Sequence, residues 1–397
     1  MITLKKKFSD SYNFIFNKVV ILRVDLNVPI DENEITDTTR IIKIIPTIEK
    51  LLNHKAKILL ITHRGRPGGK WLDELSLEII VNKLQELSSK KIYFMKNNIK
   101  SLNKSDLLDK FNKNDIIVLE NIRFYPDEEK FDEKFSKKIS SLADIFINEC
   151  FSCSHRNHSS ISGVPKFLPS FPGELLEKEI ANLKNLFLVQ NQTDGIAVIG
   201  GSKISTKIKL VSFYADKFSK VLIGGAMANT LNLAQGYEIG MSMCEKRMIK
   251  ISDEILKQFS DKIILPEDFI VTDKKFLKNP EAKLKSQIGK NDYIVDIGPQ
   301  TRMLFYKEII NTNTVLWNGP LGLFEKSPFN EGTEFVLNAI KGNKNKNFFS
   351  VAGGGDTISI LNQSNCFKDF NFVSTGGGAF LEFVQGTNMP GLTSLND

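Results

Sequence analysis

The feature that most constrains the fold is a series of short apolar runs, rich in β-branched residues, that end in polar residues or glycine. In the first half these runs are KVVILRV from Lys18, KILLIT from Lys57, DIIVLEN from Asp115 and ADIFINE from Ala143, with helical patterns between them. Runs with no apolar and polar alternation indicate strands that are buried on both faces, as in parallel sheets built from βαβ units. The first half is therefore predicted to form an α/β domain.

The second half repeats this scheme, and most of its runs end in glycine or proline. The runs are GIAVIGG from Gly195, KVLIGG from Lys220, IILPEDFIV from Ile263, YIVDIGPQT from Tyr293, TVLWNGP from Thr314, FFSVAGGG from Phe348 and FNFVSTGGG from Phe370. This periodicity predicts a second Rossmann-like domain, again a parallel sheet flanked by helices.

The chain of 397 residues is longer than one hydrophobic core usually supports, so two domains are expected. Prolines and a glycine from Pro165 onward precede a helical pattern with Glu/Lys pairs, which is a suitable domain boundary. We predict an N-terminal domain at residues 1–172, an interdomain helix at 173–188 and a C-terminal domain at 189–387, with 388–397 packing back on the first domain.

Two helices are predicted between the first two strands. Thr36 and Asp37 are placed to cap a helical stretch that contains Arg40, and Pro46 is placed to begin a second helix.

The composition is that of a soluble globular protein, with 41% hydrophobic and 25% charged residues. No apolar run approaches the roughly 18 to 20 residues of a membrane helix, and the N-terminus lacks the apolar region of a secretory signal. A cytoplasmic protein is therefore expected. The net charge of +7 suits either nucleic acid or small anions as partners, and composition does not distinguish them.

Arginine is scarce, with eight residues among 53 basic ones, and six of the eight precede residue 157. Arginine provides a planar fork that binds carboxylate and phosphate in a bidentate manner. Ligands of open parallel sheets bind at the carboxyl ends of the strands. This edge is predicted to gather basic side chains around a small anionic molecule, namely those of Arg40, His63, Arg66, Arg123, Arg156 and His158. Two polar residues, Asp25 and Asn27, are predicted to lie beside them. Taken singly, each arginine has a simpler reading as a solvated charge and each histidine as a structural residue.

The stretch from Ser350 to Leu361, SVAGGGDTISIL, passes from a strand into a helix through three glycines. Glycines allow close approach of a ligand, and the free N–H groups of a helix N-terminus favour an anion such as phosphate. Asp356 suits such a site if Mg²⁺ lies between the carboxylate and the phosphates. The alternative is an ordinary glycine-rich turn that ends in an N-capping Asp.

Cys150, Cys153, His155 and His158 resemble a zinc-binding set in their spacing. All four lie on one short stretch, whereas zinc ligands usually come from two separated segments. Free thiols are therefore favoured over a metal site, and a redox pair is the least favoured reading.

Several nucleotide-binding classes are excluded. The chain lacks the GxxxxGK[ST] sequence of P-loop proteins, the complete GxGxxG of dinucleotide-binding proteins, and the HRD and DFG motifs of protein kinases.

A set of motifs resembles the phosphoglycerate kinase family and covers nearly all of the chain. In chain order they are RVDLNVP, ITDTTRI, THRGRP, LENIRF, HRNHSS, GGSKISTK, GGAMANT, DIGPQT, LWNGPLGLFE, AGGGDT and STGGGAFLE. The resemblance implies two Rossmann-like domains joined by an interdomain helix. It also implies a monomeric, glycolytic, Mg²⁺-dependent enzyme that reversibly transfers a phosphoryl group between ATP and 3-phosphoglycerate, without nucleic acid or membrane partners.

The resemblance also implies roles for individual residues. The phosphoglycerate site would comprise Asp25, Leu26, Asn27, Arg40, His63, Arg64, Gly65, Arg66, Arg123 and Arg156. The nucleotide site would comprise Lys203, Lys207, Gly298 near the adenine, Asn318, Glu325 on the ribose, Gly353, Gly354, Gly355, Asp356 and Thr357, with Asp356 as the Mg²⁺ ligand. The catalytic residues would be Arg40, Lys203, Gly354 and Gly377. A hinge is expected around the interdomain helix and residues 374–378.

The chain departs from the family pattern at two places. Glu149, Cys150, Phe151 and Ser152 replace the usual Asp-Ala-Phe-Gly, and Thr206 replaces an Asp that many members have just before the second lysine. Two other functions are considered: an inactive anion- or nucleic-acid-binding protein on the same scaffold, and a dinucleotide dehydrogenase, which lacks its fingerprint here.

Overall fold

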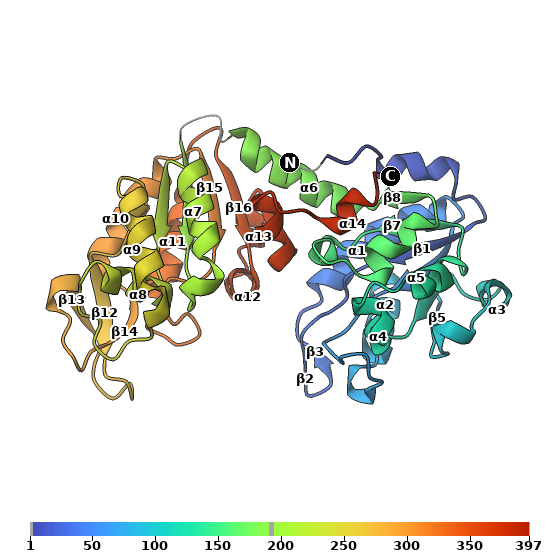
Figure 1. The fold of residues 1–397 in the computed structure, drawn as a ribbon, viewed down its shortest axis with the longest axis horizontal. Helices are drawn as coiled ribbons and strands as arrows, with labels where there is room; N and C mark the ends of the chain where they lie inside the picture. Colours follow the sequence, from blue (N-terminus) through green and yellow to red (C-terminus); the bar gives the residue numbers. More distant parts are fainter. Residues whose placement is uncertain (1–2, 190–193, 397) are drawn as a thin grey trace. The chain divides into compact units, whose positions relative to one another are not determined.

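The computed structural model describes residues 3–189 and 194–396, which form two compact units (Figure 1). The first unit is Met1–Ala181 together with Gly378–Asp397, and the second is Asn182–Gly377. The division falls within helix α6 (Glu174–Val189), close to the predicted interdomain helix. Residues 190–193, at the start of the predicted C-terminal domain, lie outside the described residues. The predicted roles of these segments as functional domains stay a prediction.

A six-stranded, fully parallel sheet forms the centre of the first unit. Its strands, in spatial order, are β5 (Ile92–Met95), β6 (Ile116–Leu119), β4 (Lys57–Ile61), β1 (Val19–Arg23), β7 (Ile145–Asn148) and β8 (Ser170–Pro172). The helices of this unit are α1 (Thr39–Asn53), α2 (Glu78–Ser88), α3 (Lys104–Phe111), α4 (Pro126–Glu129), α5 (Glu133–Ser140), α13 (Gly378–Val384) and α14 (Pro390–Thr393).

The two faces of the first sheet have separate partners because successive side chains of a strand point to opposite faces. Val20 and Leu22 of β1 pack in one core with apolar residues of α1 and α2, such as Ile48 and Leu84. Arg23 points to the other face, where it contacts Ser160 in the short helix Ser159–Gly163. The strand is buried along its whole length, so this arginine is buried with it.

The second unit contains a parallel sheet in the order β11 (Ile263–Ile264), β10 (Lys220–Ile223), β9 (Gly195–Ile199), β15 (Thr314–Asn318), β16 (Phe349–Gly353) and β17 (Phe372–Ser374). Its helices are α7 (Ile208–Lys217), α8 (Ala226–Ala234), α9 (Ile249–Gln258), α10 (Pro299–Ile310), α11 (Glu331–Gly342) and α12 (Gly355–Gln363). One core joins the sheet to α10, α11 and α12 around buried Trp317. Two parallel-strand sheets flanked by helices confirm the predicted fold class.

The structure differs from the predicted strands in the middle of the second unit. Residues 263–271 were expected to form one strand, but Pro266 follows β11 and a new strand begins at Asp268. That strand, β12 (Asp268–Thr272), pairs antiparallel with β13 (Glu281–Leu284) and β14 (Tyr293–Ile297) in a separate three-stranded sheet. An apolar run does not specify the direction of its partner strand, so the sequence pattern did not distinguish this sheet from the parallel one.

Helix α1 also differs from the prediction. It is a single helix that continues through Pro46, which was expected to begin a second helix. The N-cap residue is Thr38, and not Thr36 or Asp37 as predicted, although Asp37 Oδ1 accepts a hydrogen bond from Thr39 N, in the first residue of the helix, at 2.8 Å. Burial of Ile41, Ile44 and Ile48 on one face outweighs the loss of one helical hydrogen bond at Pro46.

Replacing Pro46 by alanine is expected to stabilise the first unit by about 1 to 2 kcal/mol. The exposed proline lacks the N–H that would bond to the carbonyl of Ile42, and restoring it outweighs the greater flexibility of the unfolded chain. The measurement is urea unfolding followed by Trp71 fluorescence in a Trp317→Phe background, where Trp71 is the remaining tryptophan. Pro126→Ala, at the start of α4, is the control and should give no such gain. Equal midpoints for Pro46→Ala and its parent would contradict the expectation.

Within residues 3–189 and 194–396, no helix is long and apolar enough to cross a membrane.

Candidate active site

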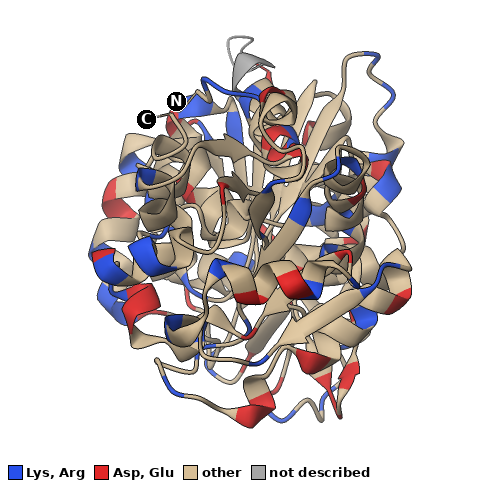
Figure 2. Cartoon of the chain, turned by 90° about the vertical axis from the view of Figure 1, so that its right-hand side faces the viewer, with Lys and Arg blue, Asp and Glu red and all other residues tan. Residues whose placement is uncertain are grey.

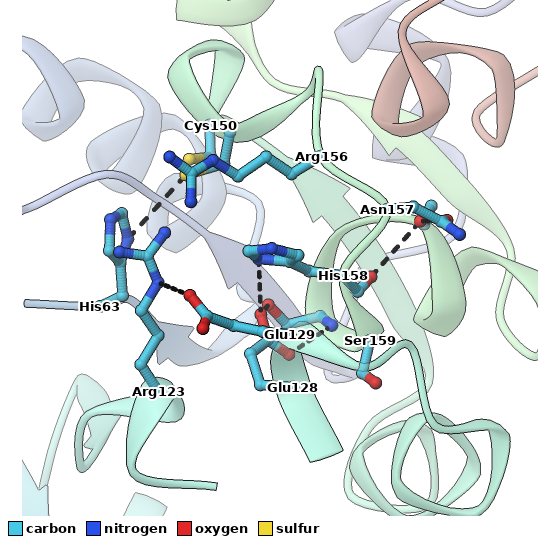
Figure 3. Close-up of polar contacts among 12 residues, drawn as sticks. His63, Arg123, Glu128, Glu129, Cys150, Arg156, Asn157, His158 and Ser159 are labelled. Carbon is cyan, nitrogen blue, oxygen red and sulfur yellow. Dashed lines mark hydrogen bonds and ion pairs between the residues drawn. The ribbon is translucent and has the colours of Figure 1, made fainter. Parts of the chain in front are cut away.

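The predicted anion-binding residues of the first unit follow the carboxyl ends of neighbouring strands. Asp25 and Asn27 follow β1, His63 follows β4, Arg123 lies in the short helix Ile122–Phe124 after β6, and Arg156 follows β7. Because these strands are adjacent and parallel, their ends meet at one edge of the sheet. We call Asp25, Asn27, Arg40, His63, Arg123, Arg156 and His158 the basic cluster, part of which is drawn in Figure 3.

Asp25 connects several members of the basic cluster. Its Oδ2 pairs with Arg40 Nη1 at 2.6 Å and also accepts a hydrogen bond from Ser152 Oγ. Arg40 Nη1 donates a second bond to the Asn27 carbonyl at 3.0 Å. The Arg40 side chain keeps 29% of its surface exposed, so the guanidinium is anchored on one side and accessible on the other.

The loop after β4 is held by the same cluster. Gly65 N donates to Asn27 Oδ1 at 2.8 Å, and the Gly65 carbonyl accepts from Arg123 Nη1 at 2.8 Å. Leu26 is buried, and its N–H bonds to Thr62 Oγ1 at 2.9 Å. Arg123 also lies 3.3 Å, Nε to Oε1, from Glu129 (Figure 3). The backbone around Gly65 is thereby fixed beside the arginines.

Two neighbouring arginines of this loop differ from each other. Arg64 is turned toward the loop, where its Nη1 donates to the Ser76 carbonyl at 2.8 Å, and burial lowers its pKa. Arg66 is exposed. Of the two, Arg66 is the better placed to bind a ligand, while Arg64 supports the loop.

Behind the basic cluster lies a buried charged group that the sequence did not single out. Arg23 Nε donates to Ser160 Oγ at 2.8 Å, and Ser160 donates from N and Oγ to the buried Glu128. Glu128 Oε1 lies 3.8 Å from His158 Nδ1 (Figure 3). Burial lowers the pKa of His158 to about 3, so this imidazole is neutral near pH 7. Its proximity to the arginines was predicted, but it contributes no charge.

Glu149 holds the start of α6 and has an unusual environment. Its carboxylate accepts bonds from Leu175 N and Leu176 N, each at 3.0 Å, and from Thr47 Oγ1. Complete burial raises the pKa of Glu149 to about 7 despite these bonds. The same residue packs against Gly173, where a Cβ would overlap the carboxylate.

The raised pKa of Glu149 is expected to lower the stability of the first unit as pH rises from about 4.5 to 7, while the lowered pKa of His158 acts in the opposite direction up to about pH 6.5. The Glu149 effect is therefore read from the difference between a Glu149 variant and its parent. Between these pH values the folded protein binds more protons at Glu149 than the unfolded chain does. The contribution of Glu149 to the free energy of unfolding is therefore present at low pH and is lost as pH rises through the pKa of the folded state. The effect amounts to about 3 kcal/mol at most. In Glu149→Gln this part of the slope should vanish, as measured by urea unfolding at several pH values in the Trp317→Phe background. An unchanged slope in the variant would exclude Glu149 as its source.

The second unit contains a cavity at the carboxyl ends of its parallel strands. Its walls come from the ends of β9 and β10, from the antiparallel strand β14 and from residues 320–325. Residues that line it include Gly201, Gly225, Phe269, Tyr293, Glu325 and Asp356. We call this the glycine-lined cavity. Its apolar wall at Phe269 and Tyr293 belongs to the sheet that the sequence pattern did not separate.

Lys207 directly precedes α7, and its side chain reaches the glycine that follows β9. Its Nζ donates to the Gly200 carbonyl at 2.6 Å and approaches the Asn318 carbonyl at 3.4 Å. Burial lowers the pKa of Lys207 to about 8, and the negative charge of Asp356 opposes this effect. A lysine that is mostly buried beside glycine carbonyls is suited to bind a phosphate that enters the cavity.

The glycine turn from Gly353 to Thr357 connects β16 to α12, as predicted. Gly354 has φ +104°, which a residue with a Cβ rarely adopts, and Asn318 Nδ2 lies 2.5 Å from where that Cβ would be. Asn318 Nδ2 donates to the Gly353 carbonyl at 2.6 Å, and Thr357 Oγ1 accepts from Gly319 N at 2.8 Å. Gly355 begins the helix, so its N-terminal N–H groups are available at this position.

Of the predicted nucleotide-site residues, Glu325 and Asp356 line the cavity, and the others lie outside its walls. Gly298 precedes α10 and packs against Asp268, whose carboxylate would overlap a Cβ there, and it is not among the residues that line the cavity. Lys203 is exposed and precedes the short helix Ile204–Thr206. Gly377, with φ +54°, follows β17 at the end of the second unit. Their predicted roles stay predictions.

The residues around the turn fit a magnesium ion carried by nucleotide phosphates. Asp356 offers a carboxylate in the cavity wall, and oxygen ligands of this kind are those that Mg²⁺ prefers, often with only one or two from the protein. The buried Oδ1 of Asn318 has no hydrogen-bond partner within the described part of the chain, which is consistent with a ligand donor there. Among the described residues, no group of three or more His, Cys, Asp or Glu side chains is arranged to hold a metal by itself.

Comparison with known proteins supports the resemblance found in the sequence. Residues 12–387 match the family model described as phosphoglycerate kinase. The chain is 40% identical over 385 residues to "Phosphoglycerate kinase" of Orientia tsutsugamushi (strain Ikeda), covering 96% of this chain and 94% of the relative. It is also 40% identical over 386 residues to "Phosphoglycerate kinase" of Wolbachia pipientis wMel, covering 96% of each.

Solved structures agree with this result. The structure of phosphoglycerate kinase from Coxiella burnetii superposes with a TM-score of 0.83 at 33% identity, covering 96% of each chain. That of phosphoglycerate kinase from Pyrococcus horikoshii OT3 gives 0.83 at 29% identity, covering 98% of each chain. A family model over nearly the whole chain, close relatives and a shared fold lead to one conclusion: the chain belongs to the phosphoglycerate kinase family.

Proposed function

We propose that this protein catalyses the reversible transfer of a phosphoryl group between ATP and the carboxylate of 3-phosphoglycerate, giving ADP and 1,3-bisphosphoglycerate. The observation that carries the proposal is the pairing, in a member of this family, of a basic cluster in one unit with a glycine-lined cavity in the other. A glycolytic role, a monomeric state and a cytoplasmic location belong to the same proposal.

The basic cluster, together with the neighbouring Arg66, suits phosphoglycerate. Arg66, Arg123 and Arg156 supply forked donors for the phosphate and carboxylate groups. Asp25 and Asn27, at the end of β1, are placed for the hydroxyl group. Arg40 would face the carboxylate that accepts the phosphoryl group, since Asp25 and the Asn27 carbonyl fix one edge of its guanidinium.

The glycine-lined cavity suits ATP. Phe269, Tyr293 and the neighbouring apolar wall would hold the adenine, and Glu325 would bind the ribose. Lys207, the N-terminus of α12 and Asn318 would hold the phosphates. Mg²⁺, bound by Asp356 and the phosphates, would neutralise part of their negative charge.

Catalysis would depend on alignment and charge stabilisation, because the migrating phosphoryl group spreads negative charge over its oxygens. Arg40 from the first unit and Lys203 from the second would stabilise that charge, together with backbone N–H groups at Gly354 and Gly377. In-line transfer requires contact between the substrates, so we infer that the units close during the reaction. Closure also excludes water, which would otherwise accept the phosphoryl group.

Small anions fit the charge distribution better than nucleic acid. Many lysines are paired with acidic residues, as in Lys50 with Glu174, Lys96 with Glu78 and Lys104 with Asp144. Figure 2 shows basic and acidic residues interspersed along the same helices. Such pairing reduces the net attraction of the surface for a long polyanion.

The test is a coupled assay with purified protein, 3-phosphoglycerate, ATP and Mg²⁺, in which 1,3-bisphosphoglycerate formation is read from NADH oxidation by a dehydrogenase. The proposal predicts turnover that requires all three components. Absence of phosphoglycerate-dependent turnover in folded protein would overturn it. A salt-sensitive complex with DNA, in place of turnover, would support the binding-protein alternative.

A further inference from the structure

Two cysteines lie together behind the basic cluster. Cys150 directly precedes the short 3₁₀ turn Phe151–Cys153 after β7, Cys153 is its last residue, and the two are 0% and 3% exposed. Cys153 N donates to the Cys150 carbonyl at 3.3 Å, which closes the turn. In a 3₁₀ turn, side chains three residues apart are eclipsed at a rise of about 6 Å, within the Cα separation that a disulfide allows. Both thiols are free in the structure.

The surroundings of the two sulfur atoms are not equivalent. Both cysteines pack with Ile161 in a small apolar cluster, but Cys153 Sγ also lies 4.0 Å from His63 Nδ1. A hydrogen bond from Cys150 holds the pKa of Cys153 well below its usual value, and positive charge from His63 and Arg23 adds to this effect. Burial raises the pKa of Cys150. Cys153 therefore has the environment of a nucleophile and Cys150 that of a resolving thiol.

Arg23 provides a second, independent observation. Its guanidinium is completely buried, and its Nη2 atom has no hydrogen-bond partner among residues 3–189 and 194–396. The electrostatic influence of Arg23 extends to both cysteines. A buried, incompletely satisfied cation stabilises an anion that forms nearby, such as a thiolate or a departing hydroxide.

We propose that Cys153 and Cys150 form an oxidisable dithiol, a modification site for hydrogen peroxide within the first unit. The Cys153 thiolate attacks one peroxide oxygen, the O–O bond breaks, and hydroxide leaves and takes up a proton, giving Cys153 sulfenic acid and water. The Cys150 thiol then attacks that sulfur, forming the Cys150–Cys153 disulfide and releasing a second water. Each cysteine loses one electron and the peroxide gains two. Peroxide is the oxidant class because the thiols are too buried for a bulky disulfide to reach.

The disulfide would act on the substrate site through Ser152. Ser152 lies between the two cysteines, and its Oγ donates to Asp25 Oδ2, which also binds Arg40. A bond between the two sulfur atoms would constrain this turn and move the Cys153 sulfur away from His63. The disulfide would therefore change the contacts that hold both Asp25 and His63 in position. This consequence rests on the proposed function. Oxidation is expected to weaken 3-phosphoglycerate binding roughly tenfold, the size of effect seen when supporting contacts of a site are lost.

The test treats the full chain with hydrogen peroxide and maps thiols by peptide mass spectrometry. Expected results are a Cys150–Cys153 disulfide in the native protein and in a Cys244→Ser/Cys366→Ser control. Cys150→Ser should accumulate a sulfenic acid at Cys153 that dimedone traps, and Cys153→Ser should leave Cys150 reduced. Calorimetry with 3-phosphoglycerate, before and after dithiothreitol, measures the consequence for binding.

Three outcomes would overturn the proposal: both thiols staying reduced while Cys244 is oxidised, Cys153 passing to sulfinic acid without a disulfide, or a dimedone adduct on Cys150 in place of Cys153. Disulfide mapping does not depend on catalysis. If the disulfide forms in a protein that shows no phosphoglycerate-dependent turnover, the proposed function fails and the dithiol stands. If turnover is normal and no disulfide forms, the dithiol proposal fails and the proposed function stands.

Discussion

Replacing Arg40 by alanine is expected to lower kcat by about 10²- to 10³-fold, the loss that follows removal of one group that stabilises transition-state charge. One edge of this guanidinium is held by Asp25 and the Asn27 carbonyl, and the remainder is accessible to a substrate. The folding cost should be only about 1 kcal/mol, because the ion pair is partly exposed and Asp25 keeps its bonds to Ser152 and to Asn27 N.

Two further variants distinguish the effect of the Arg40 charge from that of its forked geometry, and both from a nonspecific effect of replacing an arginine. Arg40→Lys keeps the charge but loses the fork, so it should recover only part of the activity. Arg247→Ala removes an arginine whose side chain is 79% exposed in the second unit and should behave like the native protein. Steady-state rates in the coupled assay and urea midpoints are the measurements. Native turnover in Arg40→Ala would refute the assigned role.

Replacing Asp356 by asparagine is expected to reduce kcat/KM for MgATP about a hundredfold, since the charged oxygen ligand for the metal is lost. Asp356 is in the first turn of α12, where its charge also favours the helix, but that contribution is only about 0.5 kcal/mol. A folding defect therefore cannot account for a large effect.

Magnesium dependence provides the control for this variant. In the native protein, chelation with EDTA should abolish turnover, and titration with Mg²⁺ should restore it. Asp356→Asn should require a higher Mg²⁺ concentration. Asp253→Asn, which removes a surface partner of Lys257, should titrate like the native protein. Identical Mg²⁺ dependence in Asp356→Asn and native protein would contradict the assignment of the ligand.

Much of the fold was predictable because buried parallel strands have a plain sequence signature. The runs at β1, β4, β6, β7, β9, β10, β15, β16 and β17 were all recognised. The short edge strands β5 and β8 were missed. Strand β5 is only half-buried, so its sequence is not a plain apolar run. Strand β8 has three residues, ends in Pro172 and follows Pro169, so its sequence is typical of a turn. The antiparallel sheet of β12, β13 and β14 was missed for a different reason, since strand direction depends on tertiary pairing.

The candidate site was predictable where a residue follows a strand directly. Asp25, His63 and Arg156 lie where the chain order of the strands indicated, at one edge of one sheet. Arg23 and Glu128 were not identified, because an arginine inside a β-branched run and a glutamate in an acidic stretch do not indicate burial. The two residues are connected through Ser160, which is more than one hundred residues from Arg23 in the sequence. A local sequence pattern does not predict a contact over such a separation.

In the proposed reaction, phosphoglycerate binds the first unit and the nucleotide binds the second. Titration calorimetry of both ligands with Arg66→Ala and Lys203→Ala tests it most directly, because both side chains are exposed and neither substitution disturbs a core. Arg66→Ala is expected to lose affinity for 3-phosphoglycerate but to keep its affinity for MgADP, and Lys203→Ala is expected to lose affinity for MgADP but to keep that for 3-phosphoglycerate. Loss of MgADP binding in Arg66→Ala, with phosphoglycerate binding intact, would contradict this expectation.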